Sequence, residues 1–231
     1  YKLTLDAGLD MHMHGPDFYW ELLDMHKSGK LSEKRIDASV KKILEAKFRL
    51  GLFEEPFIDE DKLPAALFNK DHRATALEAA RQSVVLLKND KILPLDAKKY
   101  RKVFVTGPNA NNQAILGDWA SVQPDENVVT VYDGLREVSP ETDFTIYEMD
   151  WNLRNITPAQ VRQAASMAAR NDLAIVVVGE NSMRYHWDEK TCGENSDRYD
   201  IHLYGLQQDL VEEIYKTGTP VVVVLVIVRP L

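Results

Sequence analysis

The stretch LAIVVV, residues 173–178, is a run of apolar residues with no polar residue among them. Such a run is typical of a strand that is buried on both faces of a parallel sheet. Three other stretches also read as strands, namely KVFVTG at 102–107, DFTIYEM at 143–149 and PVVVVLVIV at 220–228. Helix-forming segments separate the strands, at 130–138, 159–171 and 206–218. This alternation predicts an α/β fold with a largely parallel sheet covered by helices on both faces.

Local signals indicate where one helix begins and which side another buries. Thr157, followed by Pro158 and then by Gln160, has the pattern of a capping box at a first helical turn. Leu210 and Ile214 belong to a set of apolar residues that recur at the helical period within 206–218. We therefore expect the last helix to bury one face against the sheet.

The first 53 residues have a less regular pattern. Ser32 is a typical helix cap, and five apolar residues follow the helical period before Gly51. LDMHM at 9–13 alternates like a short strand, and FYWELLDMH at 18–26 favours a helix. Residues 1–53 therefore read as the closing fragment of an α/β unit.

The segment EEPFIDEDKLPAALFNKD, residues 54–71, loses this periodicity. Its two prolines and several acidic residues predict a linker and a domain boundary. Beyond it, HRATALEAARQS at 72–83 favours a helix and VVLLKN at 84–89 favours a strand. We expect a second domain over 72–231.

Composition narrows the class of partner. The formal net charge is −8 and the pI is about 5.3, and the Lys and Arg residues form no clustered stripe. This opposes binding to nucleic acid or to an anionic membrane surface. One cysteine, Cys192, rules out an internal disulfide. No apolar run reaches the ~20 residues that a membrane-spanning helix needs.

Several motifs that would indicate other chemistry are missing from the sequence. The turn TGPNANN at 106–112 is not a dinucleotide-binding fingerprint, and no phosphate-binding P-loop motif occurs. His12 and His14 would face the same side of a strand, which suits either metal ligation or a polar lining. Since no third ligand accompanies them, we expect no metal. We expect no cofactor either, because the sequence carries no nucleotide-binding motif.

The segment after the LAIVVV strand is much longer than a connection needs to be. Residues 179–198 read GENSMRYHWDEKTCGENSDR, whereas strand-to-helix connections usually take about 2 to 6 residues. The Gly-Glu pair occurs twice in this segment, at 179–180 and at 193–194. In parallel sheets, ligands bind beyond the carboxyl ends of the strands, so these carboxylates are candidates for a functional site.

An ordered set of motifs resembles glycoside hydrolase family 3, the family of β-glucosidases, β-xylosidases and related exo-acting enzymes. The set comprises AGLDMHM, VKKILEAKFRLGLFEEP, HRATALEAARQSVVLLKNDKILPL, VFVTGPNA, LAIVVVGE, GENSDR, LQQDLVEEI and TGTPVVVVL. The resemblance implies a (β/α)8 barrel joined by a linker to an α/β sandwich, with the active site between them. Residues 1–53 would be the end of that barrel, 54–71 the linker, and 72–231 the sandwich domain, which we expect to be truncated.

Family members retain the anomeric configuration, which requires two carboxylates about 5 to 5.5 Å apart. The resemblance implies that the nucleophile is an aspartate in a motif that precedes AGLDM. No such motif stands in this sequence, and Asp10 lies in the wrong context for that role. The general acid/base would be Glu194 in CGENSDR. Glu180, directly at the strand end, remains the alternative.

The resemblance also suggests roles for the neighbours of Glu194. Asp197 and Arg198 match a family pair and would support the loop through a charge-assisted hydrogen bond. Tyr185, His186 and Trp187 could bind substrate by stacking against a sugar ring, although packing of the loop explains them equally well. Either glutamate could instead be a solvated carboxylate that pairs with an arginine of the loop.

These features predict a fragment of a retaining exo-β-glycosidase, acting on an oligosaccharide or β-glucoside and inactive in isolation. The open alternatives are a non-catalytic sugar- or nucleotide-binding module, and a relative that uses phosphate as acceptor. The resemblance favours a periplasmic or extracellular location and leaves a homodimer open. At the last strand the sequence departs from the family pattern, because Ile227 and Val228 replace a small polar pair before Arg229.

Overall fold

The structure is a computed structural model that describes residues 1–15 and 17–229. The chain divides into two compact units, Tyr1–Val85 and Leu86–Leu231. The domain bounds expected from the sequence place the start of the second domain at residue 72 and stay predictions. Within the described residues, no helix is both long enough and apolar enough to cross a membrane.

The second unit is built on a four-stranded sheet in the order β2-β1-β3-β4. The strands are β1 (Lys102–Gly107), β2 (Asp143–Glu148), β3 (Leu173–Gly179) and β4 (Val221–Val226). All three pairings are parallel, and Val105 of β1 lies between Ile146 of β2 and Ile175 of β3. The predicted parallel sheet and the α/β fold class are therefore confirmed.

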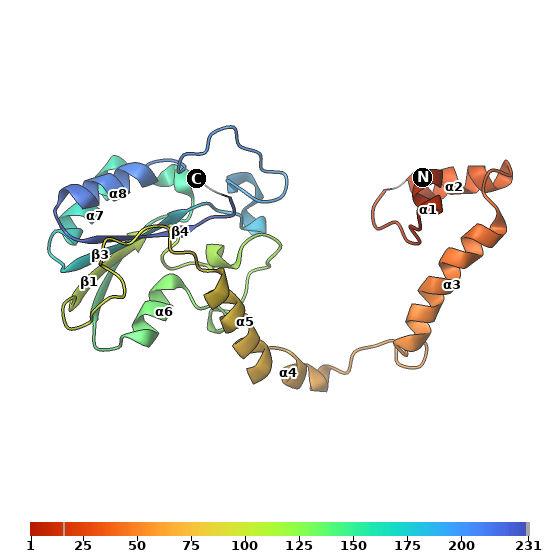
Figure 1. The fold of residues 1–231 in the computed structure, drawn as a ribbon, viewed down its shortest axis with the longest axis horizontal. Coiled ribbons are helices and arrows are strands. Elements are labelled where there is room, and N and C mark those ends of the chain that lie inside the picture. The colour runs from red at the N-terminus through yellow and green to blue at the C-terminus, as the bar shows by residue number, and fades with distance from the viewer. Residues whose placement is uncertain (16, 230–231) are drawn as a thin grey trace. The chain divides into compact units, whose positions relative to one another are not determined.

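Helices cover both faces of this sheet, as Figure 1 shows. On one face lie α7 (Pro158–Ala168) and α8 (Gln207–Lys216), which pack on inward side chains such as Phe104 and Val176. On the other face lies α6 (Val131–Val138), which packs with the segment before β1 over Val105 and Val177. Side chains that alternate along β1 and β3 thus pack into two separate hydrophobic cores, one on each face of the sheet.

Capping boxes form at the start of both α6 and α7. The hydroxyl of Thr157 accepts a hydrogen bond from the Gln160 N–H, and the Gln160 side chain accepts one from the Thr157 N–H. Thr130 and Asp133 make the same exchange at α6. The capping box predicted at Thr157 is therefore confirmed.

The connections of the second unit contain four short 3-10 helices. Each of them lies between a strand and the α-helix that follows it. They are η2 (Gln113–Leu116), η3 (Asp125–Asn127), η4 (Leu153–Asn155) and η5 (Arg184–Glu189). Two, η2 and η3, stand between β1 and α6, and η5 stands in the long segment after β3. Both connections therefore carry folded turns rather than extended chain.

The first unit is helical in its described residues. It contains α1 (Lys2–Asp6), α2 (Asp17–Lys27), α3 (Glu33–Arg49), η1 (Glu60–Lys62), α4 (Leu63–Ala66) and α5 (Lys70–Ser83). The Ser32 hydroxyl caps α3 by accepting from the Arg35 N–H, as predicted. The apolar face of α3 is largely exposed, with Val40, Leu44 and Phe48 all at least 40% accessible.

Two predicted strands, at 9–13 and 84–89, are wrong. Both segments lie outside the helices and strands of the structure. A strand requires a hydrogen-bonded neighbour, and neither segment pairs with another strand among the residues that the structure describes. Alternating or β-branched residues indicate that a segment can be extended, but they do not supply a partner.

Candidate active site

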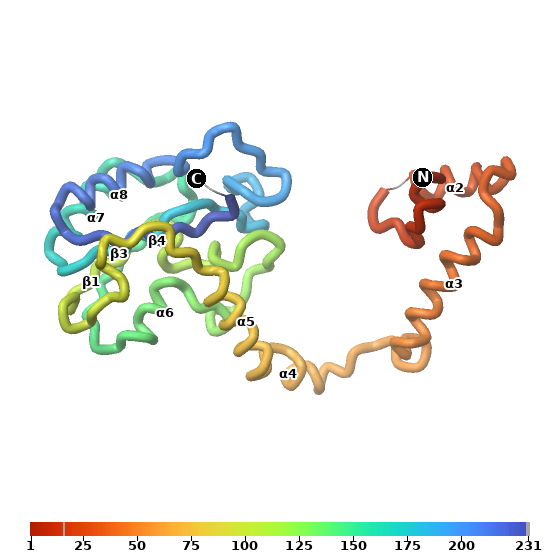
Figure 2. The backbone as a smooth tube through the Cα atoms, viewed as in Figure 1, coloured from red at the N-terminus to blue at the C-terminus, as the bar shows by residue number. Residues whose placement is uncertain are grey.

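Two long connections meet at the carboxyl end of the sheet. One joins β1 to α6 over residues 108–130, and the other joins β3 to α8 over residues 180–206. Figure 2 follows both along the backbone, and a hydrogen bond between Asp118 and Glu194 joins them across 76 residues of sequence. This end of the sheet is where parallel α/β folds bind ligands.

Glu194 lies in the second of these connections with its carboxylate accessible. Its side chain is 45% exposed, and its Oε2 atom pairs with Arg184 Nη1 at 2.7 Å. The main chain of Glu194 is held on both sides. Its N–H donates to Asp118 Oδ2 at 2.6 Å, and its carbonyl oxygen accepts from Lys190 Nζ at 2.8 Å.

Asp118 was not among the predicted site residues, yet it is central to this cluster. Its carboxylate is 14% exposed and accepts a further hydrogen bond from the Trp119 N–H at 2.9 Å. Burial raises the pKa of the Asp118 carboxyl, but the two N–H donors and the nearby Lys190 and Arg184 charges outweigh burial and bring the pKa below its ordinary value.

Gly193 permits this close approach. Its φ is +91°, and a Cβ atom there would lie 2.4 Å from Asp118 Oδ2. Any other residue would therefore meet both a strained backbone and a clash. The glycine of the second Gly-Glu pair is needed so that the main chain at Glu194 can lie against Asp118.

Aromatic rings and cations stack beside Glu194. The Arg184 guanidinium lies 3.8 Å from the Trp119 ring centre and 5.1 Å from that of Trp187. Lys190 Nζ lies 4.1 Å from the Trp187 ring centre. Trp119 is 72% exposed and has a positive φ of 61°, a conformation uncommon for a bulky residue. The two tryptophans thus flank the arginine that pairs with Glu194.

The other predicted aromatic residues contact different partners. The Tyr185 hydroxyl donates to Met183 Sδ at 2.8 Å, and burial raises the pKa of Tyr185. The His186 ring stacks on Trp151 with centroids 3.8 Å apart and lies 4.9 Å from the Tyr185 ring. Tyr185 and His186 therefore belong to a second ring cluster, apart from the Trp119–Arg184–Trp187 stack.

Glu180 lies in very different surroundings from Glu194. Its side chain is 1% exposed, and Oε1 lies 3.3 Å from Arg198 Nη1 and 3.4 Å from Arg229 Nε. Oε2 accepts from the Val228 N–H at 3.4 Å. A buried carboxylate requires partners of this kind, and the arrangement ties the loop and the end of β4 to the end of β3.

Arg198 bonds to Glu180 rather than to its neighbour Asp197. Its second nitrogen donates to the His202 carbonyl, while Asp197 lies exposed on the surface. Cys192 is buried close by, and burial together with the Glu180 charge raises the pKa of its thiol to about 11. The thiol is therefore protonated at neutral pH.

No metal site forms in the part of the chain that the structure describes, since no three His, Cys, Asp or Glu side chains converge there. The His12 ring stacks on Phe18 with centroids 4.5 Å apart. Asp10 is bound to α3, where Lys42 first and Ser39 next lower the pKa of its carboxyl.

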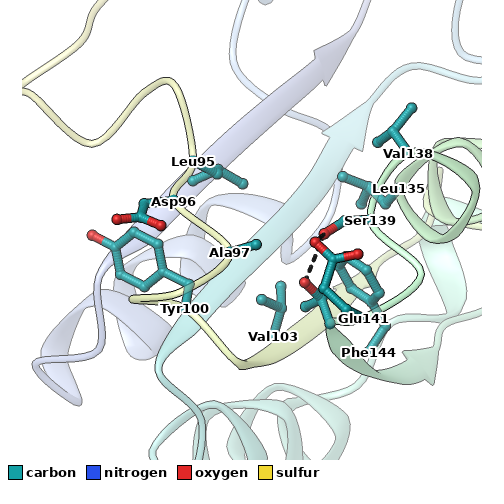
Figure 3. Close-up of a pocket in the computed structure, with 11 residues that line it drawn as sticks. Leu95, Asp96, Ala97, Tyr100, Val103, Leu135, Val138, Ser139, Glu141 and Phe144 are labelled. Atoms are coloured by element: carbon teal, nitrogen blue, oxygen red, sulfur yellow. Dashed lines mark hydrogen bonds between the residues drawn. The ribbon is translucent and has the colours of Figure 1, made fainter.

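A cavity of about 280 Å³ lies at the opposite end of the sheet, near the starts of β1 and β2. Figure 3 shows the residues that line it, which are mostly apolar, and the Ser139 hydroxyl among them donates to Glu141. None of the predicted site residues lines this cavity.

A family model and several known proteins match this chain. Residues 84–231 match the model of the glycosyl hydrolase family 3 C-terminal domain. A β-xylosidase of Formosa agariphila is 37% identical over 206 residues, which cover 86% of this chain and 27% of that protein. The periplasmic β-glucosidase of Salmonella typhimurium is 30% identical over 256 residues, which cover 100% of this chain and 32% of that protein.

Among solved structures, the β-glucosidase from Listeria innocua in complex with glucose superposes with a TM-score of 0.77 at 27% sequence identity. The match covers 96% of this chain and 29% of that one. The chain therefore spans about a quarter to a third of the length of the relatives that it matches.

Proposed function

This chain belongs to glycosyl hydrolase family 3, and on that premise we propose that it supplies the general acid/base of a retaining exo-β-glycosidase. The observation that carries the proposal is the setting of Glu194. Its carboxylate is 45% exposed at the carboxyl end of a parallel sheet, while its main chain is held by Asp118 and Lys190. A general acid must reach the substrate and must also be held in position.

Glu180 suits this role less well than Glu194. Its side chain is 1% exposed and pairs with Arg198 and Arg229. Proton transfer to a glycosidic oxygen requires contact within hydrogen-bonding distance, which a buried carboxylate between two arginines does not offer. We therefore assign Glu180 a structural role and Glu194 the catalytic one.

The proposed reaction is a double displacement. First, Glu194 donates its proton to the glycosidic oxygen, the bond from that oxygen to the anomeric carbon breaks, and an aspartate carboxylate bonds to the carbon. Then water attacks this carbon, Glu194 takes a proton from the water, and the aspartate leaves. These 231 residues contain no counterpart of the family's aspartate motif, so we propose that another part of a longer protein provides it.

The proposed substrate is a terminal β-linked glucose. The Listeria innocua structure that this chain resembles is a β-glucosidase in complex with glucose, and the Salmonella typhimurium relative is also named a β-glucosidase. A terminal β-xylose is the second candidate, favoured by the 37% identity to the Formosa agariphila β-xylosidase. The Salmonella typhimurium enzyme is named periplasmic, and we propose a periplasmic or extracellular location here as well.

The test is the Glu194→Gln variant of the longer protein, assayed on matched nitrophenyl β-glucosides and β-xylosides. Removal of a general acid/base is expected to lower the rate about 10²- to 10⁴-fold. Azide should restore turnover of an activated substrate, because azide attacks the sugar without needing a base. Glu189→Gln, the same change in the same connection, serves as the control and should retain activity.

Unchanged rates in Glu194→Gln would remove that residue from the mechanism. Calorimetry that detects glucose or mononucleotide binding without any turnover would favour the non-catalytic binding module. The 231-residue chain alone should not hydrolyse either substrate, because it lacks the nucleophile motif, and turnover by this chain would contradict that part of the proposal.

A further inference from the structure

Asp118 lies in the connection between β1 and α6, outside the loop that carries Glu194. We propose that Asp118 is a positioning residue, which fixes the main chain at Glu194 and thereby places the carboxylate for proton transfer. This inference rests on the function proposed above for Glu194. Asp118 itself has no part in bond making or breaking.

The connection that carries Asp118 contacts the one that carries Glu194. Asp118 Oδ2 accepts from the Glu194 N–H at 2.6 Å, and Oδ1 accepts from the Trp119 N–H at 2.9 Å. Hydrogen bonds to an ionised carboxylate are short and about twice as strong as those between neutral groups. The position of Glu194 is therefore tied to the segment that follows β1.

The positive charge of Lys190 lies close to the Asp118 carboxylate. Lys190 Nζ lies 3.6 Å from Asp118 Oδ2, and the Lys190 side chain is only 1% exposed. The same Nζ donates to the Glu194 carbonyl at 2.8 Å. Asp118 therefore holds the N–H of Glu194, and Lys190 holds its carbonyl. The Asp118–Lys190 ion pair is largely buried, so added salt should weaken it little.

Glu194 lies between two residues whose backbone φ is positive. Gly193 has φ +91° and Asn195 has φ +59°. Gly and Asn adopt such a conformation more readily than other residues do. The contacts of Asp118 and Lys190 hold the main chain of the residue between them.

The position of Glu194 should affect the rate of the proposed reaction. The side chain of Glu194 is 45% exposed and its ionic contact is Arg184, which Asp118 also contacts at 3.4 Å. A displacement of about 1 Å at a catalytic group can lower a rate about 10²-fold. Since the connection that carries Glu194 is long, loss of the Asp118 carboxylate should permit such a displacement.

The kinetic test uses Asp118→Ala and Asp118→Asn in the longer protein, on aryl β-glycosides whose leaving groups range from acidic to weakly acidic phenols. Protonation by Glu194 matters most for the poor leaving groups. Asp118→Ala should therefore lower kcat/KM about 10²-fold for these and much less for the best ones. Asp118→Asn, which keeps one acceptor oxygen but no charge, should fall between Asp118→Ala and the unchanged protein. Asp125→Asn, an exposed aspartate of the same connection, is the matched control.

A purely structural role predicts a different result, namely equal losses in kcat/KM across all leaving groups, and that result would overturn the proposal. Glu194→Gln is run in parallel as a reference. If it shows no dependence on the leaving group, the proposed function fails, and the positioning role fails with it. If it shows the dependence and Asp118→Ala does not, only the positioning role fails.

A second measurement needs no catalysis. Hydrogen exchange at the Glu194 amide in the 231-residue chain should be faster in Asp118→Ala, because the N–H loses its acceptor. Exchange in β3 should be unchanged, which shows that the sheet remains folded. Equal protection of the Glu194 amide in both proteins would show that Asp118 does not hold this N–H, and it would overturn the proposal.

Discussion

Glu180 and Glu194 each follow a glycine in the same connection, but one side chain is 1% exposed and the other is 45% exposed. The sequence predicted both as candidates, with Glu194 preferred and Glu180 as the alternative, but it did not indicate how differently they would be buried. Burial of Glu180 depends on Arg198 and Arg229, which approach from the far end of the connection and from beyond β4. Contacts of this kind are set by the fold rather than by local pattern.

Asp118 was missed for a related reason. The segment GDWA at 117–120 reads as a polar turn, and its partner Glu194 is 76 residues away. The available signals were an aspartate before an exposed tryptophan and a glycine before Glu194. Neither indicates a contact until the strands that precede these connections are known to be neighbours in the sheet.

The buried ion pair of Glu180 should stabilise the folded chain. Glu180→Gln removes the charge that faces Arg198, whose side chain is 11% exposed, and a buried pair broken in this way costs about 3 kcal/mol. Urea unfolding should show a correspondingly lower midpoint.

The control for Glu180→Gln is Glu213→Gln. Glu213 pairs with Lys216 on the surface, where the two side chains are 43% and 62% exposed, and its loss should leave the midpoint nearly unchanged. Equal midpoints for the two variants would contradict the structural role assigned to Glu180.

At the scale of elements, the sequence predicted most accurately what is decided locally. The capping box at Thr157 and the cap at Ser32 involve residues within one turn, and both form as expected. The predicted strands at 9–13 and 84–89 failed because pairing depends on a distant partner. The prediction of β3 succeeded because its continuous apolar run is typical of a strand that is buried on both faces, as β3 is.

The Thr157 capping box should stabilise the start of α7. Thr157→Ala removes the acceptor for the Gln160 N–H and should lower the free energy of unfolding by about 1 kcal/mol. Ser166→Ala, at an exposed position within the same helix, replaces a weaker helix former with a stronger one and should leave stability equal or slightly higher. Thermal unfolding followed by circular dichroism would compare them. A larger loss in Ser166→Ala than in Thr157→Ala would contradict the role of the cap.

At the scale of the whole molecule, the two units differ in how much apolar surface they bury. Both core clusters belong to the second unit. In the described residues of the first unit, Leu5 and Leu31 are the buried hydrophobic residues, while Leu50, Phe57 and other large side chains are exposed. A unit that buries so little cannot offset its conformational entropy.

This difference predicts that residues 86–231 alone keep a cooperative unfolding transition, whereas residues 1–85 alone do not. Limited proteolysis of the chain should cut between residues 50 and 85 first and leave the second unit intact. Mass spectrometry would identify the cuts. Early cleavage within β1 or β3 would contradict the prediction.

The anchoring of one connection by another has a consequence for loop grafting between relatives. A chimaera in which another loop replaces residues 184–198 would also need a matching residue at position 118, because Lys190, Gly193 and Glu194 of the present loop all lie against Asp118. Exchanging both segments together avoids a mismatch between them. Exchanges of loops between relatives should therefore treat the two connections as one module.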